Sequence, residues 1–276
     1  ESSFGASTPV EANYLSPVDP QARWTRTYKD GAAKYSYSVN YLIDCKHAVI
    51  MDVEGTTAVR TAEVHSTRVM LDRVEARNHI KPDRLSGDTA YGSAEMLNWL
   101  VNERGIEPHI PVFDKSFRKD GIFERSDFTF DAEDDRYVCP AGKSLRRYRV
   151  AGRAAKAKPP RDGLYRYRAR KTDCDDCPLK HRCCPKEPMR KILRSVHEEA
   201  RDVARRIMAS EAYVTSRRER KKVEMLFAHL KRILKLDRLR LRGPNGAKDE
   251  FLLAATAQNL RKLAKLSIQG ALPAAG

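Results

Sequence analysis

The stretch YSYSVNYLID, residues 35–44, constrains the fold of this chain more than any other feature. Its aromatic and aliphatic side chains alternate with Ser and Asn, which is the pattern of a strand with one buried face. The polar turn DCKH leads from it into a second strand-like run, AVIMDVE. Two such runs joined by a short turn predict an antiparallel hairpin. Its apolar face must then be buried against another layer of the structure.

After the hairpin, the pattern changes to helical spacing. Between residues 61 and 79, Val64, Leu71 and Val74 share one helical face. The segment DRLSGD then predicts a short strand that ends at Asp88, Ser93 is expected to cap a second helix, and EPHIPV predicts another strand. The order β-β-α-β-α-β favours a mixed α/β sheet with flanking helices.

Shifts in composition divide the chain into five parts. We expect residues 1–33 to form an irregular arm, and residues 34–112 contain the strand and helix pattern just described. Residues 113–190 are rich in charge, Gly and Pro, with short strand-like pieces such as DFTF and RYVC, which indicates an inserted module. Residues 191–268 have a nearly continuous helical pattern that is broken at RGPNGA before a final helix, and residues 269–276 form a tail.

The chain is strongly basic, with 53 Lys and Arg residues, 37 Asp and Glu residues and a formal net charge of +16. Because the basic residues are spread along the chain, the expected partner is a polyanion, and nucleic acid is favoured over a membrane surface. No run approaches the roughly 18 apolar residues of a membrane-spanning helix, and no secretory leader is recognisable. We therefore expect a soluble intracellular protein without a membrane partner.

Five of the six cysteines lie in one segment, and Cys45 stands apart from them. In a reducing compartment such clustering favours a metal over disulfides. Four thiolates can close a tetrahedral zinc site, with buried reduced thiols as the alternative. The expected ligands are Cys139, Cys174, Cys177 and Cys183, with Cys184 or His181 as substitutes. The neighbouring basic runs RRYRV and YRYRARK suggest that this module also contacts DNA, with Tyr side chains available for stacking.

The segment RRERKKVEMLFAHLKRILKL, residues 217–236, predicts a basic helix with one carboxylate, Glu224, beside Arg220 and Lys231 on a single face. Val223, Leu226, Leu230 and Ile233 are expected to face the core. A solvated basic helix does not require an acid at this place, whereas a helix that holds a metal ion beside a phosphate backbone does. The alternative is that Glu224 simply pairs with Arg220, which would contribute only a few tenths of a kcal/mol.

The phrase GDTAYGS, residues 87–93, places Asp88 at the end of a strand and before a Gly-containing turn. In α/β sheets ligands bind at this kind of position. The alternative is that Asp88 only caps the turn.

Together, LSGDTAYGSAEML, RRERKKVEMLFAHLKRILKLDRLRLRG and AATAQNLRKL resemble the catalytic half of a DDE-type insertion-sequence transposase. The resemblance covers residues 17–266. In that family a ribonuclease H-like sheet carries an Asp after its fourth strand, and a Glu arrives on a later helix. Arg220, Glu224 and Lys231 match three positions of the family's Tyr, Arg, Glu, Lys helix signature, and Arg217 stands at the Tyr position.

The resemblance implies an α/β, ribonuclease H-like core. Residues 34–112 would begin this core and residues 191–268 would complete it, while the cysteine-rich insertion matches one branch of the family. The implied function is metal-dependent phosphodiester hydrolysis and strand transfer at insertion-sequence ends. Asp88 and Glu224 would bind Mg²⁺ or Mn²⁺, since Mg²⁺ prefers hard oxygen ligands.

The implied partners are double-stranded DNA, both transposon ends and target, and further copies of the chain, because two ends must be joined. The protein would act in the bacterial cytoplasm, in association with the nucleoid. The residues expected to bind DNA phosphates are Arg217, Arg220, Lys221, Lys231, Arg238 and Arg242.

The family's third catalytic carboxylate lies on the first strand of its sheet, and residues 1–34 contain no matching phrase. We therefore expect this chain to lack an N-terminal region that carries the first Asp. Asp44 is the leading substitute within the chain, ahead of Asp52. Two other functions remain open: an inactive transposase remnant that only binds DNA, and a zinc-ribbon protein that binds RNA. A ribonuclease on the same fold is a third.

Overall fold

The computed structural model describes residues 15–26, 32–114, 120–148, 160, 162–236 and 238–268. They form two compact units. The first unit contains the chain up to Ala90 and from Met208 onward, and the second contains Tyr91–Ile207. The second unit thus includes the predicted insertion, 113–190, together with residues on either side of it. The predicted tail, 269–276, and parts of the predicted arm lie outside the described residues.

A three-stranded antiparallel sheet forms the centre of the first unit. Its strands are β1 (Arg23–Thr25), β2 (Lys34–Asp44) and β3 (Val49–Thr57), in the order β1-β2-β3. The predicted hairpin is therefore confirmed, with a register shift between Leu42 and Ile43. Strand β1 is short and lies in the segment for which we expected an irregular arm.

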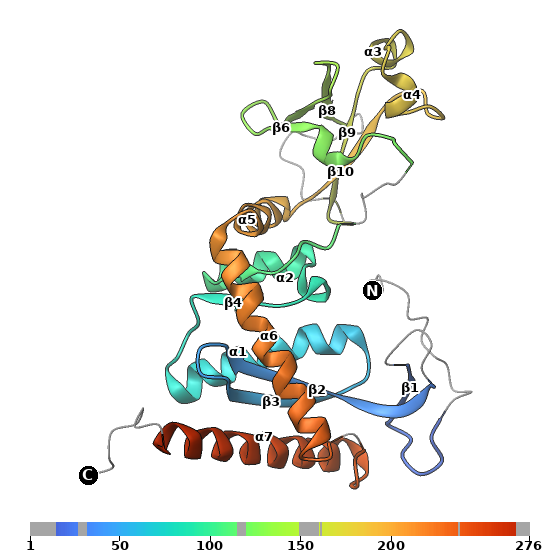
Figure 1. Ribbon diagram of the computed structural model, residues 1–276. Helices are drawn as coiled ribbons and strands as arrows, with labels where there is room; N and C mark the ends of the chain where they lie inside the picture. The colour runs from blue at the N-terminus through green and yellow to red at the C-terminus, as the bar shows by residue number, and fades with distance from the viewer. Residues whose placement is uncertain are drawn as a thin grey trace. The chain divides into compact units, whose positions relative to one another are not determined.

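Helices cover both faces of this sheet, because alternate residues of β2 point in opposite directions. Ser38 Oγ donates to Glu63 of α1 (Arg60–Asn78), whereas Tyr41 Oη donates to the carbonyl of Phe251 in α7 (Gly243–Ile268). Helices α1 and α7 accordingly lie on opposite sides of β2 and β3 (Figure 1).

Helix α6 (Glu211–Arg232) shares its core with α7 and the hairpin. The buried members of this core are Ile50, Val53, Leu226, Leu230, Ala247, Phe251, Ala254 and Ala255. Ile233, which we expected in the core, is 62% exposed because α6 ends at Arg232 and Ile233 caps it.

The predicted break at RGPNGA is displaced. Helix α7 begins at Gly243, so Pro244 lies in its first turn instead of before it. Proline is tolerated there because the N–H that it lacks would have no intrahelical partner. The expected all-helical segment 191–268 also begins with a strand, β10 (Lys191–Ser195), ahead of α5 (Glu198–Met208).

Short elements follow α1. Strand β4 (Arg84–Ser86) ends before Asp88, the turn η2 spans Thr89–Tyr91, and α2 spans Ala94–Asn98. As predicted, Ser93 caps α2, and its Oγ accepts the N–H of Met96 at 3.2 Å. A π-helical segment, Trp99–Arg104, and β5 (Glu107–His109) come next.

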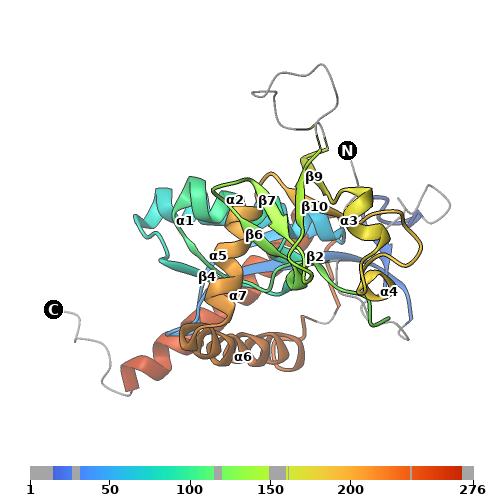
Figure 2. The same cartoon turned by 90° about the horizontal axis from the view of Figure 1, so that it is seen from above.

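A five-stranded antiparallel sheet forms much of the second unit. Its order is β10-β9-β8-β7-β6, and β9 and β10 run alongside each other (Figure 2). The strands are β6 (Thr129–Asp131), β7 (Arg136–Val138), β8 (Ser144–Arg147), β9 (Leu164–Arg168) and β10; the turn η4 (Arg125–Asp127) precedes them, and α3 (Lys171–Asp175) and α4 (Lys180–Cys183) follow β9.

The aromatic core of this sheet is built around Phe130, Tyr137 and Tyr167, whose rings pack with tilted and edge-on geometry. Both units thus combine helices and sheets, which confirms the predicted α/β class. No helix in the described ranges is long and apolar enough to cross a membrane.

Candidate functional site

Helix α6 is fixed beside the segment that carries Asp88. Arg220 Nη1 donates to the carbonyl oxygen of Gly87 at 2.8 Å, and Arg84 pairs with Glu219 at 3.0 Å between Nη2 and Oε2. Gly87 directly precedes Asp88, so the first contact joins α6 to this turn. The middle of α6 and the end of β4 therefore form one supported surface of the first unit.

Glu224 lies one helical turn beyond Arg220, about 6 Å along the axis. Its side chain is exposed, and it forms no ion pair with any residue that the structure describes. The interpretation that Glu224 simply pairs with Arg220 is wrong, because the Arg220 guanidinium is bound to Gly87. An exposed carboxylate without a cationic partner on a basic helix is available to a metal ion.

Asp88 is also exposed, and its Oδ1 accepts the N–H of Ala90 at 2.7 Å. The turn-cap interpretation is thus confirmed. It leaves Oδ2, which accepts no hydrogen bond from a residue within the described ranges. A carboxylate held by a turn through one oxygen can still offer the other to a cation.

Asp44 caps the hairpin turn, where its two oxygens accept the N–H groups of Lys46 and His47 at 2.9 and 3.1 Å. Cys45 follows Asp44 in this turn. Burial raises the pKa of its thiol, and the negative charges of Glu219 on α6 and of Asp44 raise it further. The turn therefore lies close to α6. The alternative Asp52 is 9% exposed and bound to Arg73 at 2.7 Å. Its carboxylate is therefore already used in an ion pair within the first unit.

The predicted phosphate-binding residues divide into two groups. Arg220 is half-buried and holds Gly87, so it supports the site from within the protein. The others are exposed and make no ion pair with a described residue: Arg217, Lys221, Lys231, Arg238 and Arg242. These five side chains can reach an external polyanion.

In the part of the chain that the structure describes, no group of three or more Cys, His, Asp or Glu side chains could hold a metal ion. The structure shows Asp88 and Glu224, the residues predicted to bind magnesium, as two separate exposed carboxylates. Both are accessible hard-oxygen donors, and Mg²⁺ commonly uses one or two carboxylates and keeps several of its waters. The donor chemistry fits Mg²⁺ or Mn²⁺.

The clustered cysteines gather in the second unit around one small cavity. All of them are reduced, Cys174 and Cys184 are buried, and burial raises the pKa of Cys183 to about 12. Cys139 Sγ accepts the N–H of Lys143 at 3.3 Å. The four predicted ligands line this cavity together with Cys184, but they do not form a metal-binding group. As observed, Cys174 and Cys184 are buried in the hydrophobic core, and Cys139 and Cys183 pack against it.

Two polar residues with large structural roles escaped the sequence analysis. Asn259 of α7 forms a two-point contact with the backbone of Ile50, accepting from its N–H at 2.9 Å and donating to its carbonyl at 2.8 Å. Asn259 lies in the phrase AATAQNLRKL, which carried part of the resemblance. The position of Asn259 beside the buried Ala254 and Ala255 of this helix was the available signal, because an amide close to a packed face needs a partner.

The second is Glu198, which is 1% exposed and contacts three arginines. Arg125 and Arg205 reach its Oε1 at 2.8 Å, and Arg201 reaches Oε2 at 2.9 Å. Burial opposes ionisation, but Arg201, Arg125 and Arg205 outweigh it and lower the pKa of Glu198. The Glu-Arg spacing along α5 indicated part of this network; Arg125 comes from a distant segment.

Residues 138–264 match the family model of the transposase DDE domain. The match includes Glu224, Lys231 and the clustered cysteines, and Asp88 lies before it. No curated protein and no solved structure matches the chain significantly. The match over residues 138–264 supports the resemblance to the DDE-type transposases.

Proposed function

We propose that this chain carries a metal-dependent DNA cleavage and strand-transfer site in its first unit, on a ribonuclease H-like sheet. The observation that carries the proposal is the contact of Arg220 with Gly87, at 2.8 Å. It joins the Asp88 turn to α6, on which Glu224 stands exposed one turn later. The family match over residues 138–264 supports DNA as the substrate.

In this proposal Asp88 and Glu224 would hold Mg²⁺ or Mn²⁺, which would supply positive charge beside the scissile phosphate. Arg217, Lys221 and Lys231 bind neighbouring phosphates, with Arg238 and Arg242 beyond the helix end. Water first releases a 3′-hydroxyl at an insertion-sequence end, and that hydroxyl then attacks target DNA. Joining two ends requires assembly of several copies on DNA.

Asp44 is the leading candidate within the chain for the third carboxylate, in place of an Asp from an N-terminal region that we expect the chain to lack. Since both of its oxygens accept backbone N–H groups, a metal would have to compete with the hairpin turn. We expect Asp44→Asn to weaken cleavage less than Asp88→Ala does.

The test is nicking of labelled linear DNA in Mn²⁺ or Mg²⁺ by the full chain, by Asp88→Ala and by Glu224→Gln. Asp249→Asn, an exposed acid on α7 of the same unit, is the matched control. Loss of nicking in the two site variants, with the control unaffected, supports the proposal. DNA binding without nicking in the wild type would favour the inactive remnant. Preferential binding to RNA, with equal affinity in the wild type and in all three variants, would favour the RNA-binding alternative.

Zinc at the clustered cysteines is a separate proposal, favoured by their convergence on one cavity and by the backbone N–H directed at Cys139. A thiolate that accepts an N–H is a stabilised ligand. Elemental analysis of protein purified without added metal should give one zinc per chain, and Cys174→Ser should lose it. A wild-type protein without zinc would leave the thiols as core residues.

A further inference from the structure

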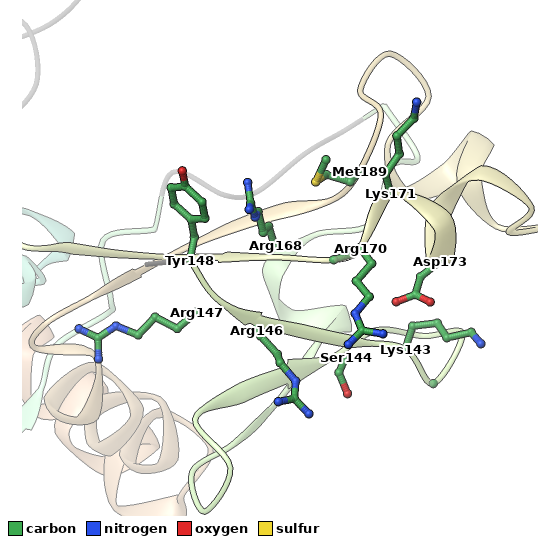
Figure 3. Close-up of a pocket in the computed structure, with 12 residues that line it drawn as sticks. Lys143, Ser144, Arg146, Arg147, Tyr148, Arg168, Arg170, Lys171, Asp173 and Met189 are labelled. Atoms are coloured by element: carbon green, nitrogen blue, oxygen red, sulfur yellow. The ribbon is translucent and has the colours of Figure 1, made fainter. Parts of the chain in front are cut away.

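A cleft of about 710 Å³ opens between β8, β9 and α3 of the second unit. We call it the basic cleft, because six of its twelve lining residues are cationic. They are Lys143, Arg146, Arg147, Arg168, Arg170 and Lys171, with Asp173 as the acid among them. Figure 3 shows Arg146 and Arg170 extending to the same side of the strands, and Arg168 beside Tyr148.

Several basic residues elsewhere in the second unit are paired with carboxylates. Arg136 contacts Asp131, Arg166 contacts Asp162, Lys180 contacts Asp175, and Lys191 contacts Glu187. In the basic cleft Arg147 approaches Asp135 at 3.7 Å, and the other five cations make no ion pair with a described residue. Gathering like charges without counter-charges costs folding energy. The arrangement therefore indicates an anion supplied from outside.

Two arginines of the basic cleft are supported by aromatic rings. The guanidinium of Arg168 lies 3.9 Å from the ring centroid of Tyr148, and that of Arg147 lies 3.7 Å from the centroid of Tyr165. Such contacts orient a cation without neutralising it. Each ring has one face covered by a guanidinium, so it is less available for base stacking than the sequence suggested. This geometry favours contact with phosphates over contact with exposed bases.

The lining also excludes an ordinary small-molecule site, which is mostly apolar with a few polar groups. Here six of the twelve lining residues are Lys or Arg, so positive charge distinguishes the cleft. We propose that the basic cleft binds the phosphate backbone of duplex DNA. The inference rests on the proposed function for the identity of the polymer, and it adds a second DNA-binding surface apart from α6.

The test is the salt dependence of binding to a fluorescein-labelled DNA duplex, measured by anisotropy with the full chain between about 50 and 200 mM salt. The cleft variant combines Arg146→Ala, Arg168→Ala and Arg170→Ala, all at exposed positions. The control combines Arg166→Ala, Lys186→Ala and Arg206→Ala, which removes the same charge from exposed positions of the second unit outside the basic cleft.

If each lost cation removes one phosphate contact, the slope of log K against log salt becomes shallower by about 2 to 3 in the cleft variant. At low salt its affinity should fall about tenfold or more, while the control changes by about twofold or less. Equal losses in both variants would overturn the proposal, because net charge alone would then explain binding. Cleft-dependent binding that prefers single-stranded DNA or RNA at matched salt would overturn it too.

Nicking in Mn²⁺ is measured on the same preparations, so that the two proposals can fail separately. Nicking that requires Asp88, with DNA binding insensitive to the cleft variant, would contradict this inference alone. Cleft-dependent duplex binding without any nicking would contradict the proposed function and leave the basic cleft as a DNA-binding surface.

Discussion

Glu198 is a single residue that forms ion pairs with three arginines of the second unit. Its carboxylate is 1% exposed, and both of its oxygens are used by guanidinium groups and by the N–H of Ser195. Removing one member of a buried ionic network leaves the other charges desolvated and unpaired. Arg125, Arg201 and Arg205 would then face one another without the acid that holds them.

We expect Glu198→Gln to lower the free energy of unfolding of the second unit by about 3 to 5 kcal/mol. Urea unfolding can be followed through Trp99, which belongs to the second unit, in a Trp24→Phe background. The exposed pair of Lys191 and Glu187 offers the control. Glu187→Gln should cost less than about 1 kcal/mol, as exposed pairs do. Similar losses in the two variants would show that burial of Glu198 contributes little.

The same residue predicts a dependence on pH. Because the pKa of Glu198 is lowered in the folded state, its contribution to stability is complete above the unfolded carboxyl value of about 4.3. It is lost as the pH falls through the folded-state pKa. The difference in unfolding free energy between wild type and Glu198→Gln should therefore be constant near neutral pH and shrink in acid. Urea titrations across this range measure it, and a difference that grows in acid would contradict the assignment.

At the scale of elements, Asn259 decides how α7 joins the hairpin. Its amide satisfies the N–H and the carbonyl of Ile50, a buried position of β3. A hydrophobic replacement leaves both backbone groups without a partner, and each buried unsatisfied group costs about 1 to 3 kcal/mol.

We therefore expect Asn259→Leu to destabilise the first unit by about 2 to 4 kcal/mol. Fluorescence of Trp24, in a Trp99→Phe background, reports this unit. The control is Thr256→Ala on the same helix, where the exposed hydroxyl only donates to the carbonyl of Leu252. Asn259→Leu with wild-type stability would mean that water satisfies Ile50 instead.

Elements set by local pattern were predictable from the sequence. The alternation in β2, the helical spacing of α1 and the Ser93 cap all depend on near neighbours. Strand β10 was missed because its residues, KILRS, lie beside a long helical pattern, and pairing with β9 decides their conformation. Non-local partners were also unreadable: Arg220 was expected to pair with Glu224 or with DNA, and its actual partner is the carbonyl of Gly87.

The candidate site shows the same division. Motif spacing singled out Asp88 and Glu224, and both are exposed as a metal-binding role requires. Asp88 and Asp44 both cap turns by accepting backbone N–H groups two or three residues further along the chain. Only the cap at Asp88 was recognised from the sequence, because a Gly-containing turn follows it. The basic cleft could be suspected from RRYRV and YRYRARK. Only the structure, which shows where the carboxylates lie, distinguishes its paired cation from the unpaired ones.

For the whole molecule, the decisive feature is that each unit contains a hydrophobic cluster of its own. One centres on Phe251, Leu230 and Ile50, and the other on Tyr137 and Tyr167. Stability is conferred by the residues that each core buries, so a substitution acts first on the unit that contains it. The chain places one tryptophan in each unit, Trp24 in the first and Trp99 in the second, and thus provides a separate reporter for each.

We predict that the two reporters respond separately. Asn259→Leu should lower the urea midpoint seen by Trp24 and leave that of Trp99 nearly unchanged, and Glu198→Gln should do the opposite. Two variants in different units should then show additive effects, because residues without shared partners rarely couple by more than about 0.5 kcal/mol. If either substitution moved both midpoints together, the units would unfold as one cooperative body. Stabilising the second unit would then also stabilise the surface that carries Asp88 and Glu224.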